Sequence, residues 1–237
     1  AGVAGVAAGV ATRLGAGKRR RPGGGVTLRE RARRAAGGCA AAGTVGGTGA
    51  YRDAVGRSAQ AHGAREAFNP SWERGQSTSV RTAARFAAAH GYDLLLVMVA
   101  DQPYVEASHL DTLLRASAEG GACPCAPRGA GRQGNPCLFD RACFPLLAEL
   151  DGDAGARSML RAHPELGVRA VPVADARVLA DADTPDELAR AEAALPRGRQ
   201  VPGGRAAARP CAVPHARPPH RAPRPPPARP HRPRGNP

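Results

Sequence analysis

The 237-residue sequence has no paired cysteine motif, no long apolar run and only one tryptophan. Its six cysteines show no Cys-x-x-Cys spacing, and Cys123-Pro124-Cys125 is too tight for an ordinary zinc knuckle, so we expect free thiols. No apolar run reaches the length of a membrane helix, and no secretory leader pattern opens the chain. These absences predict a soluble, cytoplasmic protein without a membrane partner.

The C-terminal segment, residues 196–237, lacks acidic side chains and has almost no apolar ones to bury. It holds ten of the 34 Lys and Arg residues and 13 of the 23 prolines, which predicts a disordered tail with local polyproline II structure. The rest of the chain has 24 basic against 20 acidic residues, so most of the +14 charge belongs to the tail. This distribution argues against nucleic acid as a partner, although a basic arm for RNA or acidic partners, or a frame-shifted terminus, would have the same composition.

Residues 1–195 are enough for one α/β domain with a substantial core. Strand-like and helix-like segments alternate along it, which predicts a doubly wound, mostly parallel sheet. Strands are expected at 3–7, 40–45, 64–68, 94–100, 122–126, 136–139 and 168–173, and helices at 26–36, 51–62, 77–90, 108–118, 154–162 and 184–195.

A loop of small residues, Ala7–Lys18, follows the first expected strand and ends in a cation. Glycine lets backbone N–H groups approach an anion closely, and Arg13 and Lys18 can neutralise phosphate charge. The spacing does not match the P-loop, because Arg19 follows Lys18 where that motif has Ser or Thr, and it does not match the Gly-x-Gly-x-x-Gly dinucleotide fingerprint either. The loop therefore predicts a nucleotide site, and a flexible N-terminal segment is the alternative.

The apolar run Leu94–Ala100 is typical of a strand buried on both faces of a parallel sheet, and it stops at Asp101-Gln102-Pro103. An acid at the carboxyl end of such a strand lies where open α/β sheets bind ligands. We therefore expect Asp101 to hold Mg²⁺ on a nucleotide. The alternative is that Asp101 or Ser108 caps the following helix.

The segment 69–79 combines structural and functional signals. Ser77 and Ser79 can be explained as a helix start, but the preceding Asn69-Pro70-Ser71-Trp72 and Gly75 cannot. Trp72 is expected either as a core side chain or as a stacking surface.

Near the C-terminal end of the domain, Thr184, Pro185 and Glu187 predict a capping box. This box does not explain Asp181 and Asp183, which we expect on one face of a short strand with a cation near them.

Several motifs occur together in a fixed order, and their order resembles the MobA-like nucleotidyltransferases, with molybdenum cofactor cytidylyltransferase as the closest branch. The resemblance covers about residues 1–195 and implies a Rossmann-like nucleotidyltransferase fold. Its motifs are Ala7-Ala8-Gly9 with Arg13, Gly15 and Lys18; Asn69-Pro70 with Trp72, Gly75, Ser77, Ser79 and Val80; Ala100–Pro103; Gly134-Asn135-Pro136 with Leu138 and Phe139; Gly152-Asp153 with Gly155, Ala156 and Arg157; and Asp181, Asp183, Thr184, Pro185, Glu187 and Leu188.

The resemblance implies transfer of CMP from CTP to the phosphate of molybdopterin, with release of pyrophosphate. It implies as partners CTP or another NTP, a molybdopterin-type phosphate, and a molybdoenzyme or its maturation chaperone. The implied catalytic residues are Lys18, Arg13 and Asp101, and the implied Mg²⁺ ligands are Asp101 and Asp183. The implied nucleotide-binding residues are Ala8, Gly9, Thr12, Arg13, Gly15, Lys18, Asn69, Ser77 and Ser79.

Two departures from the family pattern keep other functions open. Arg19-Arg20-Arg21 stands where relatives carry leucine-rich residues, and the expected second strand lacks the usual β-branched residues. A non-catalytic nucleotide-binding protein is therefore one alternative. An NAD(P)H- or flavin-dependent oxidoreductase of the nicotine-blue type on the same fold is the other.

Overall fold

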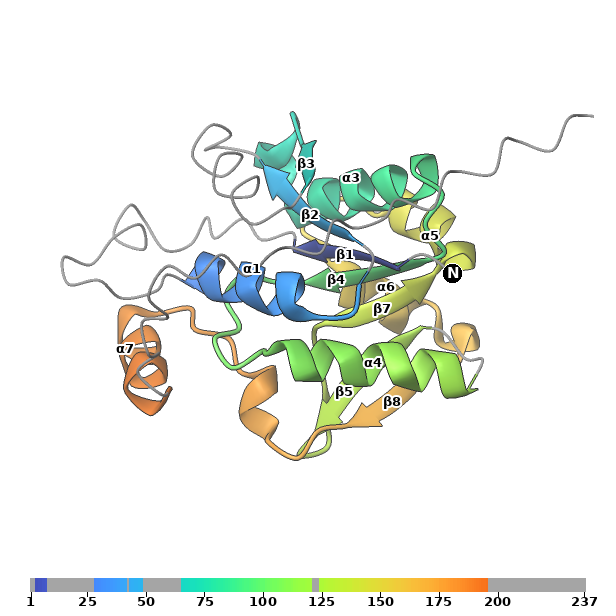
Figure 1. Cartoon of the computed structure of the whole chain (residues 1–237). Helices are drawn as coiled ribbons and strands as arrows, with labels where there is room; N and C mark the ends of the chain where they lie inside the picture. The colour runs from blue at the N-terminus through green and yellow to red at the C-terminus, as the bar shows by residue number, and fades with distance from the viewer. Residues whose placement is uncertain (1–2, 8–27, 42, 49–64, 121–123, 196–237) are drawn as a thin grey trace, which may run out of the picture.

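Eight strands pair into one sheet in a computed structural model of the chain, which describes residues 3–7, 28–41, 43–48, 65–120 and 124–195 (Figure 1). Across the sheet the strands are β3 (Arg65–Phe68), β2 (Gly43–Thr48), β1 (Val3–Ala7), β4 (Leu94–Met98), β7 (Cys137–Asp140), β5 (Cys125–Gly129) and β6 (Arg132–Gln133), with β8 (Arg169–Pro172) beside β5.

The strand directions confirm the expected mostly parallel sheet. β3, β2, β1 and β4 are mutually parallel, and β8 is parallel to β5. β7 runs antiparallel to both of its neighbours, and β6 is antiparallel to β5. The chain leaves β1 toward β2 and returns to β4 on the other side of β1, so the strand order reverses between β1 and β4. Open α/β sheets bind their ligands at such a switch point.

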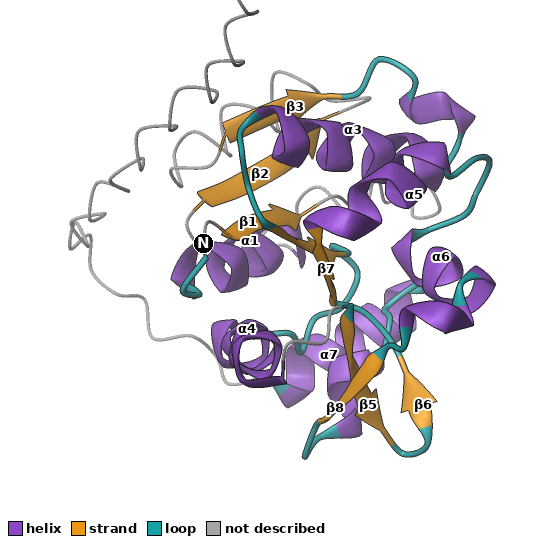
Figure 2. Cartoon of the chain, turned by 90° about the vertical axis from the view of Figure 1, so that its right-hand side faces the viewer, coloured by secondary structure: helices purple, strands orange, loops and turns teal. Residues whose placement is uncertain are grey.

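Helices cover both faces of the sheet, as expected for a doubly wound fold (Figure 2). On one face lie α1 (Leu28–Gly38) and α4 (Ala107–Gly120), which contact each other. On the other lie α3 (Gln76–Ala89), α5 (Phe144–Glu149) and α6 (Ala156–Ala162). The last helix, α7 (Pro185–Ala194), lies beyond the carboxyl ends of β1 and β4, on the left of Figure 1.

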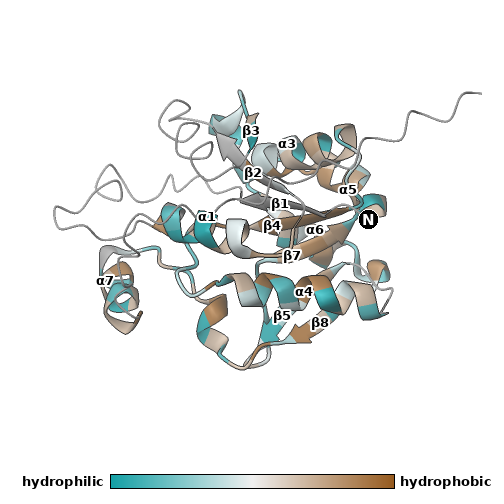
Figure 3. Cartoon of the chain, in the orientation of Figure 1, coloured by the Kyte–Doolittle hydropathy of each residue, from teal (hydrophilic) through white to brown (hydrophobic). Residues whose placement is uncertain are grey.

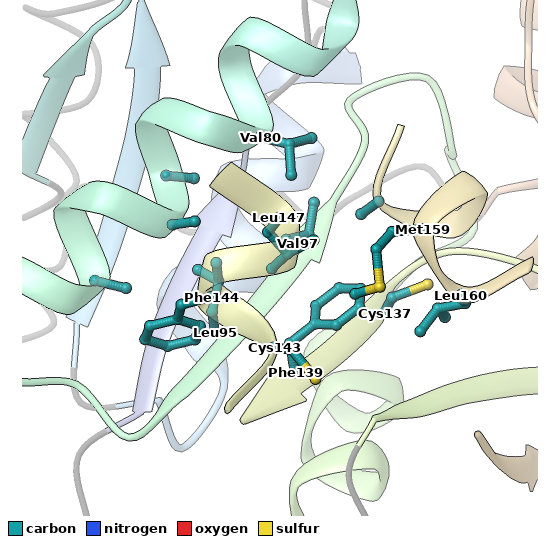
Figure 4. Packing of buried hydrophobic residues seen from close by; sticks show 14 of the residues in the cluster. Val80, Leu95, Val97, Cys137, Phe139, Cys143, Phe144, Leu147, Met159 and Leu160 are labelled. Atoms are coloured by element: carbon teal, nitrogen blue, oxygen red, sulfur yellow. The ribbon is translucent and has the colours of Figure 1, made fainter. Parts of the chain in front are cut away.

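The side chains of β4 alternate between two cores. Leu95 and Val97 belong to the core under α3 and α5, whereas Leu96 and Met98 belong to the core under α1 and α4. Figure 4 shows Leu95 and Val97 among aromatic and aliphatic side chains of the first core, and Figure 3 shows that β4 and β7 are hydrophobic along their length. This two-sided burial explains why the sequence of β4 is a continuous apolar run rather than an alternating one.

The expected elements differ from the structure mainly at their ends. The second strand was expected at 40–45 but lies at 43–48, and the fifth was expected at 122–126 but lies at 125–129. Residues 180–183 form an irregular segment, so the short strand expected for Asp181 and Asp183 is wrong. The expected helix 51–62 and the tail 196–237 lie outside the described residues.

Two expectations drawn from absences can be compared with the described part of the chain. No disulfide joins Cys39, Cys125, Cys137 and Cys143, the cysteines that the structure describes. None of the described helices is both long and apolar enough to cross a bilayer.

Phe139 on β7 offers a test of the core. Its side chain is fully buried in the core under α3 and α5. Phe139→Ala should lower the free energy of unfolding by about 3–5 kcal/mol, because it removes a buried ring and leaves a cavity. Urea denaturation measures this loss. Phe68→Ala, at a phenylalanine that is 42% exposed, is the matched control and should cost much less; equal losses would contradict the packing described.

Candidate active site

The strands β1 and β4 end side by side at one edge of the sheet. They are parallel neighbours in which Ala7 pairs with Met98, so the loop expected to bind nucleotide begins at the edge where Asp101 lies. The loop residues Ala8, Gly9, Thr12, Arg13, Gly15 and Lys18 themselves lie outside the described part of the chain.

Asp101 leaves β4 and is tied to the segment before α7. The backbone N–H of Ala182 donates a hydrogen bond of 2.8 Å to the carbonyl oxygen of Asp101. This single backbone contact brings the acids on both sides of Ala182 to the carboxyl end of β4. Because α4 begins only at Ala107, Asp101 does not cap it, and the helix-cap alternative for Asp101 is wrong.

The environment of Asp181 shows that the acids form an electrostatically coupled group. The pKa of Asp181 is raised, first by desolvation and then by the nearby Asp101 carboxylate, with a smaller contribution from Asp183. The Asp181 side chain nevertheless reaches solvent, so its carboxylate is only partly shielded from water. A hydrogen bond from the amide of Gln102 and the charge of Arg157 act in the opposite direction and favour the ionised form of Asp181.

Gln102 is almost completely buried at this edge, with 5% of its surface exposed. Its Oε1 has no hydrogen-bond partner among the described residues, while its amide supports Asp181. A buried amide oxygen without a partner is costly, and such atoms are rare in folded proteins. The sequence analysis missed Gln102 as a site residue, although it directly follows Asp101.

Asp183 lies at the start of the expected capping box, which the structure confirms. Thr184 accepts a hydrogen bond from the backbone of Glu187, and the Glu187 carboxylate accepts from the backbone N–H groups of Asp183 and Thr184. Asp181 and Asp183 are both exposed on either side of the buried Ala182. The backbone therefore places both acids toward solvent without forming a strand.

Asn69 has a structural task in this arrangement. Its side-chain amide donates to Thr78 Oγ1 at 2.8 Å and to Ser79 Oγ at 3.1 Å, and its Oδ1 accepts from the backbone N–H of Ser71. Both amide hydrogens are thus used within the protein, which favours a role in holding the start of α3 over the expected direct contact with nucleotide. That contact stays a prediction for Ser77 and Ser79, of which Ser77 is fully buried with its Oγ unpartnered among the described residues.

Trp72 is not a core side chain. It is half-buried in a short 3₁₀ helix, Trp72–Arg74, in which no residue is fully buried. The expected core role is therefore wrong, and the stacking surface stays a prediction.

Two sequence motifs distant in the chain meet at the start of α3. The backbone N–H of Ser77 donates to the carbonyl oxygen of Gly152 at 3.2 Å. Gly75 has a φ of 111° and a ψ of 173°, a region essentially restricted to glycine, and a Cβ there would overlap the carbonyl group of Gly152. A Cβ on Gly155 would lie 2.8 Å from Gln76 Oε1. These close approaches explain why both motifs contain glycine at these positions.

Arg157 lies in the first turn of α6. Its charge lowers the pKa of Asp181 and partly offsets the burial that raises the pKa of Cys137 to about 12. Cys137 begins β7 and pairs with Val97 on β4, so its position marks the edge from which Asp101 emerges.

No cluster of three or more His, Cys, Asp or Glu side chains arranged to hold a metal by itself occurs within the described ranges.

A family model described as the MobA-like NTP transferase domain matches residues 6–170, well over half of the chain. The chain belongs to the MobA-like NTP transferase family. This finding confirms the resemblance on which the expected fold rested.

Known proteins of similar sequence and structure agree with the family. Purine catabolism protein PucB of Bacillus subtilis is 37% identical over 116 residues, which cover 48% of this chain; the chain thus spans 55% of that curated relative's length. The Rv0371c homologue of Mycobacterium sp. strain JC1 is 27% identical, with a TM-score of 0.67 over 81% of this chain and 95% of its own. Mycobacterium tuberculosis Rv0371c in complex with manganese is 25% identical, with a TM-score of 0.63 over 81% and 98%.

Gly75 gives a test of the contact between the two motifs in this MobA-like NTP transferase. Gly75→Ala should lower the free energy of unfolding by about 3 kcal/mol or more, because it combines backbone strain with overlap against Gly152. Gly91→Ala is the matched control, since Gly91 also has positive φ but open space around its Cα, and it should cost about 1–2 kcal/mol. Thermal and chemical denaturation measure both; the same loss in both variants would show that no tight contact exists at Gly75.

Proposed function

We propose that this protein transfers CMP from CTP to the phosphate of a molybdopterin-type acceptor, with release of pyrophosphate. The observation that carries the proposal is the coupled acid group at the switch point of the sheet, where Ala182 holds the Asp181–Asp183 segment against Asp101. The family provides the reaction class.

The position of the acids matches the needs of nucleotidyl transfer. The nucleotide loop begins where β1 ends, and β1 is the direct neighbour of β4. A triphosphate on that loop would therefore meet the acids that follow β4. An oxygen of the acceptor phosphate attacks the α-phosphorus of CTP, a new P–O bond forms, and the bond to pyrophosphate breaks.

The donor set at this edge fits a divalent metal. Magnesium prefers oxygen ligands and usually takes one or two carboxylates together with substrate phosphates and waters. Asp101 and Asp183 are the proposed protein ligands, and Asp181 lies within electrostatic reach of both. The manganese complex of the mycobacterial relative is consistent with such a site. When bound, the metal would neutralise phosphate charge.

The chain itself supplies orientation and positive charge. Backbone amides from Gly9 to Gly15 and the side chain of Arg13 are proposed to hold the triphosphate. Lys18 would stabilise charge that develops on the α-phosphate. The choice of CTP rests on the loop sequence Ala7-Ala8-Gly9, since the guanylyl branch usually has Ala-Gly-Gly there. The product, the acceptor with CMP attached, would then pass to a molybdoenzyme or its maturation chaperone.

Asp101→Asn tests the acid group. The substitution keeps the size of the side chain but removes its charge, so CMP transfer should fall by a factor on the order of 10² or more. Circular dichroism and thermal unfolding should remain unchanged, because the side chain is not part of either core. Asp186→Asn, at an exposed acid on α7, is the control and should keep full activity. Unchanged turnover of Asp101→Asn at saturating Mg²⁺ would remove Asp101 from the mechanism.

Lys18→Ala separates transfer from mere binding. If its ammonium group stabilises charge that develops at the α-phosphate, kcat should fall by a factor on the order of 10²–10³ with little change in KM for CTP. Steady-state kinetics and a direct CTP titration measure the two effects. A higher KM with unchanged kcat would instead make Lys18 a residue that only binds CTP. If the unaltered protein transfers no nucleotide but oxidises NAD(P)H, the oxidoreductase alternative replaces this proposal.

A further inference from the structure

The turn Gly134–Pro136 belongs to a motif that the proposed mechanism does not use, and the sheet places it beside the acids. It leads into β7, whose first residue, Cys137, pairs with Val97 on the antiparallel strand β4. The amino end of β7 therefore adjoins the carboxyl end of β4, and the turn lies at the edge where Asp101 follows that strand. Because β1 is the neighbour of β4 on its other side, the turn and the nucleotide loop lie on opposite sides of β4.

Contacts with two other segments hold this turn in place. The backbone N–H of Gly134 donates to the carbonyl oxygen of Pro127 at 3.1 Å, which attaches the turn to β5. A Cβ on Gly134 would lie 3.0 Å from Cδ2 of Leu179, so the turn packs closely on the segment before α7. Ala182 in that segment donates its N–H to the carbonyl oxygen of Asp101 at 2.8 Å. The turn, the end of β4 and the segment before α7 thus meet at one place.

The side-chain amide of Asn135 is oriented by the buried thiol of Cys137. Cys137 lies in the core with Met159 and Leu160 (Figure 4), and burial raises the pKa of its thiol to about 12, so the sulfur keeps its proton. The sulfur lies 3.5 Å from Asn135 Oδ1 and 3.5 Å from the carbonyl oxygen of Gly134, and these two acceptors share its hydrogen. Because Oδ1 faces the thiol, Nδ2, at the other corner of the planar amide, is turned away from it.

The donors of this amide are unused within the protein. Asn135 is half-buried, and its Nδ2 makes no hydrogen bond to the part of the chain that the structure describes. Asn69, the other asparagine of that part, uses its Nδ2 for Thr78 and Ser79. An amide N–H is a suitable donor for a phosphate oxygen, and hydrogen bonds to charged groups are stronger than those between neutral groups. The orientation of Asn135 therefore suits an anionic ligand at this edge.

We propose that Asn135 donates a hydrogen bond from Nδ2 to an oxygen of the acceptor's phosphate monoester. This inference rests on the proposed function and adds a protein group that recognises the acceptor. The nucleotide loop follows β1 on one side of β4, and Asn135 precedes β7 on the other. A phosphate at Asn135 therefore faces a triphosphate on the loop across the end of β4, where Asp101 lies. In-line transfer needs such an arrangement, because the acceptor oxygen must approach the α-phosphorus from the side opposite the leaving pyrophosphate.

Asn135→Asp tests this contact by calorimetry on the full chain without CTP. The probes are 6-hydroxymethylpterin phosphate and 6-hydroxymethylpterin, which differ only in the phosphate. Aspartate keeps an oxygen for the Cys137 thiol but replaces both N–H donors with a negative charge. Affinity for the phosphate ester should therefore fall by a factor on the order of 10², while affinity for the dephosphorylated pterin and the midpoint of thermal unfolding stay unchanged. Asn135→Ala, which removes the donors without adding charge, should weaken binding of the ester about 10-fold.

Gln133→Glu is the matched control, because it makes the same change from amide to carboxylate two residues earlier in the chain. Gln133 is exposed on β6, and it should bind both probes with unchanged affinity after the substitution. A loss of ester binding as large as that in Asn135→Asp would show that any negative charge added near the turn repels the ester. That result would overturn the proposal.

Three further outcomes would also overturn it. Equal loss for both pterins in Asn135→Asp would show that Asn135 only shapes the site, and no loss would show that it faces away from the ligand. No preference of the unaltered protein for the phosphate ester would show that no such subsite exists. CMP transfer is measured separately, as KM for the acceptor against KM for CTP, and only the first should rise in Asn135→Ala. A protein that binds the phosphate ester through Asn135 but transfers no CMP would refute the proposed function and leave the phosphate contact of Asn135 standing.

Discussion

Burial of β4 on both of its faces is the constraint on which the rest of the structure depends. Leu95 and Val97 fill one core while Leu96 and Met98 fill the other, so neither rotation nor a one-residue shift of the strand is tolerated. The register of β4 therefore fixes the place at the edge of the sheet where Asp101 follows the strand. The polar chemistry of the site begins where this apolar run ends, and its geometry derives from packing several residues away.

Contacts of the main chain, rather than of side chains, also hold this edge of the sheet in place. Ala182 is buried and donates its N–H to the carbonyl oxygen of Asp101, and Gly75 and Gly152 meet with no space for a Cβ. Backbone contacts of this kind orient charged groups without using the charged groups themselves. Asp101 and the segment that carries Asp181 and Asp183 are thereby held together at the carboxyl end of β4 by the main chain.

Local signals in the sequence were sufficient for some features. The apolar run predicted β4 and the position of Asp101, and Thr184 with Glu187 predicted the capping box of α7 because both signals lie within a few residues. The second strand was placed three residues early because Gly43–Thr48 has little β-propensity and forms through its neighbours. The hydrogen bonds of Asn69 and the unpartnered buried oxygen of Gln102 depend on neighbours that the fold brings together, which spacing does not reveal. The short β6 and α5 have too few residues for a periodic pattern.

The place of β1 in the sheet also determines the order in which the molecule can assemble. β1 precedes the other described strands in the sequence, yet it lies between β2 and β4, and its pairing with β4 joins residues about ninety positions apart. Pairings of such long sequence separation must overcome a large loss of chain entropy before they stabilise anything. The side of β1 that pairs with β4 therefore stays without its partner until β4 has been synthesised. A ribosome that pauses before residue 98 would hold a nascent chain that needs protection from aggregation.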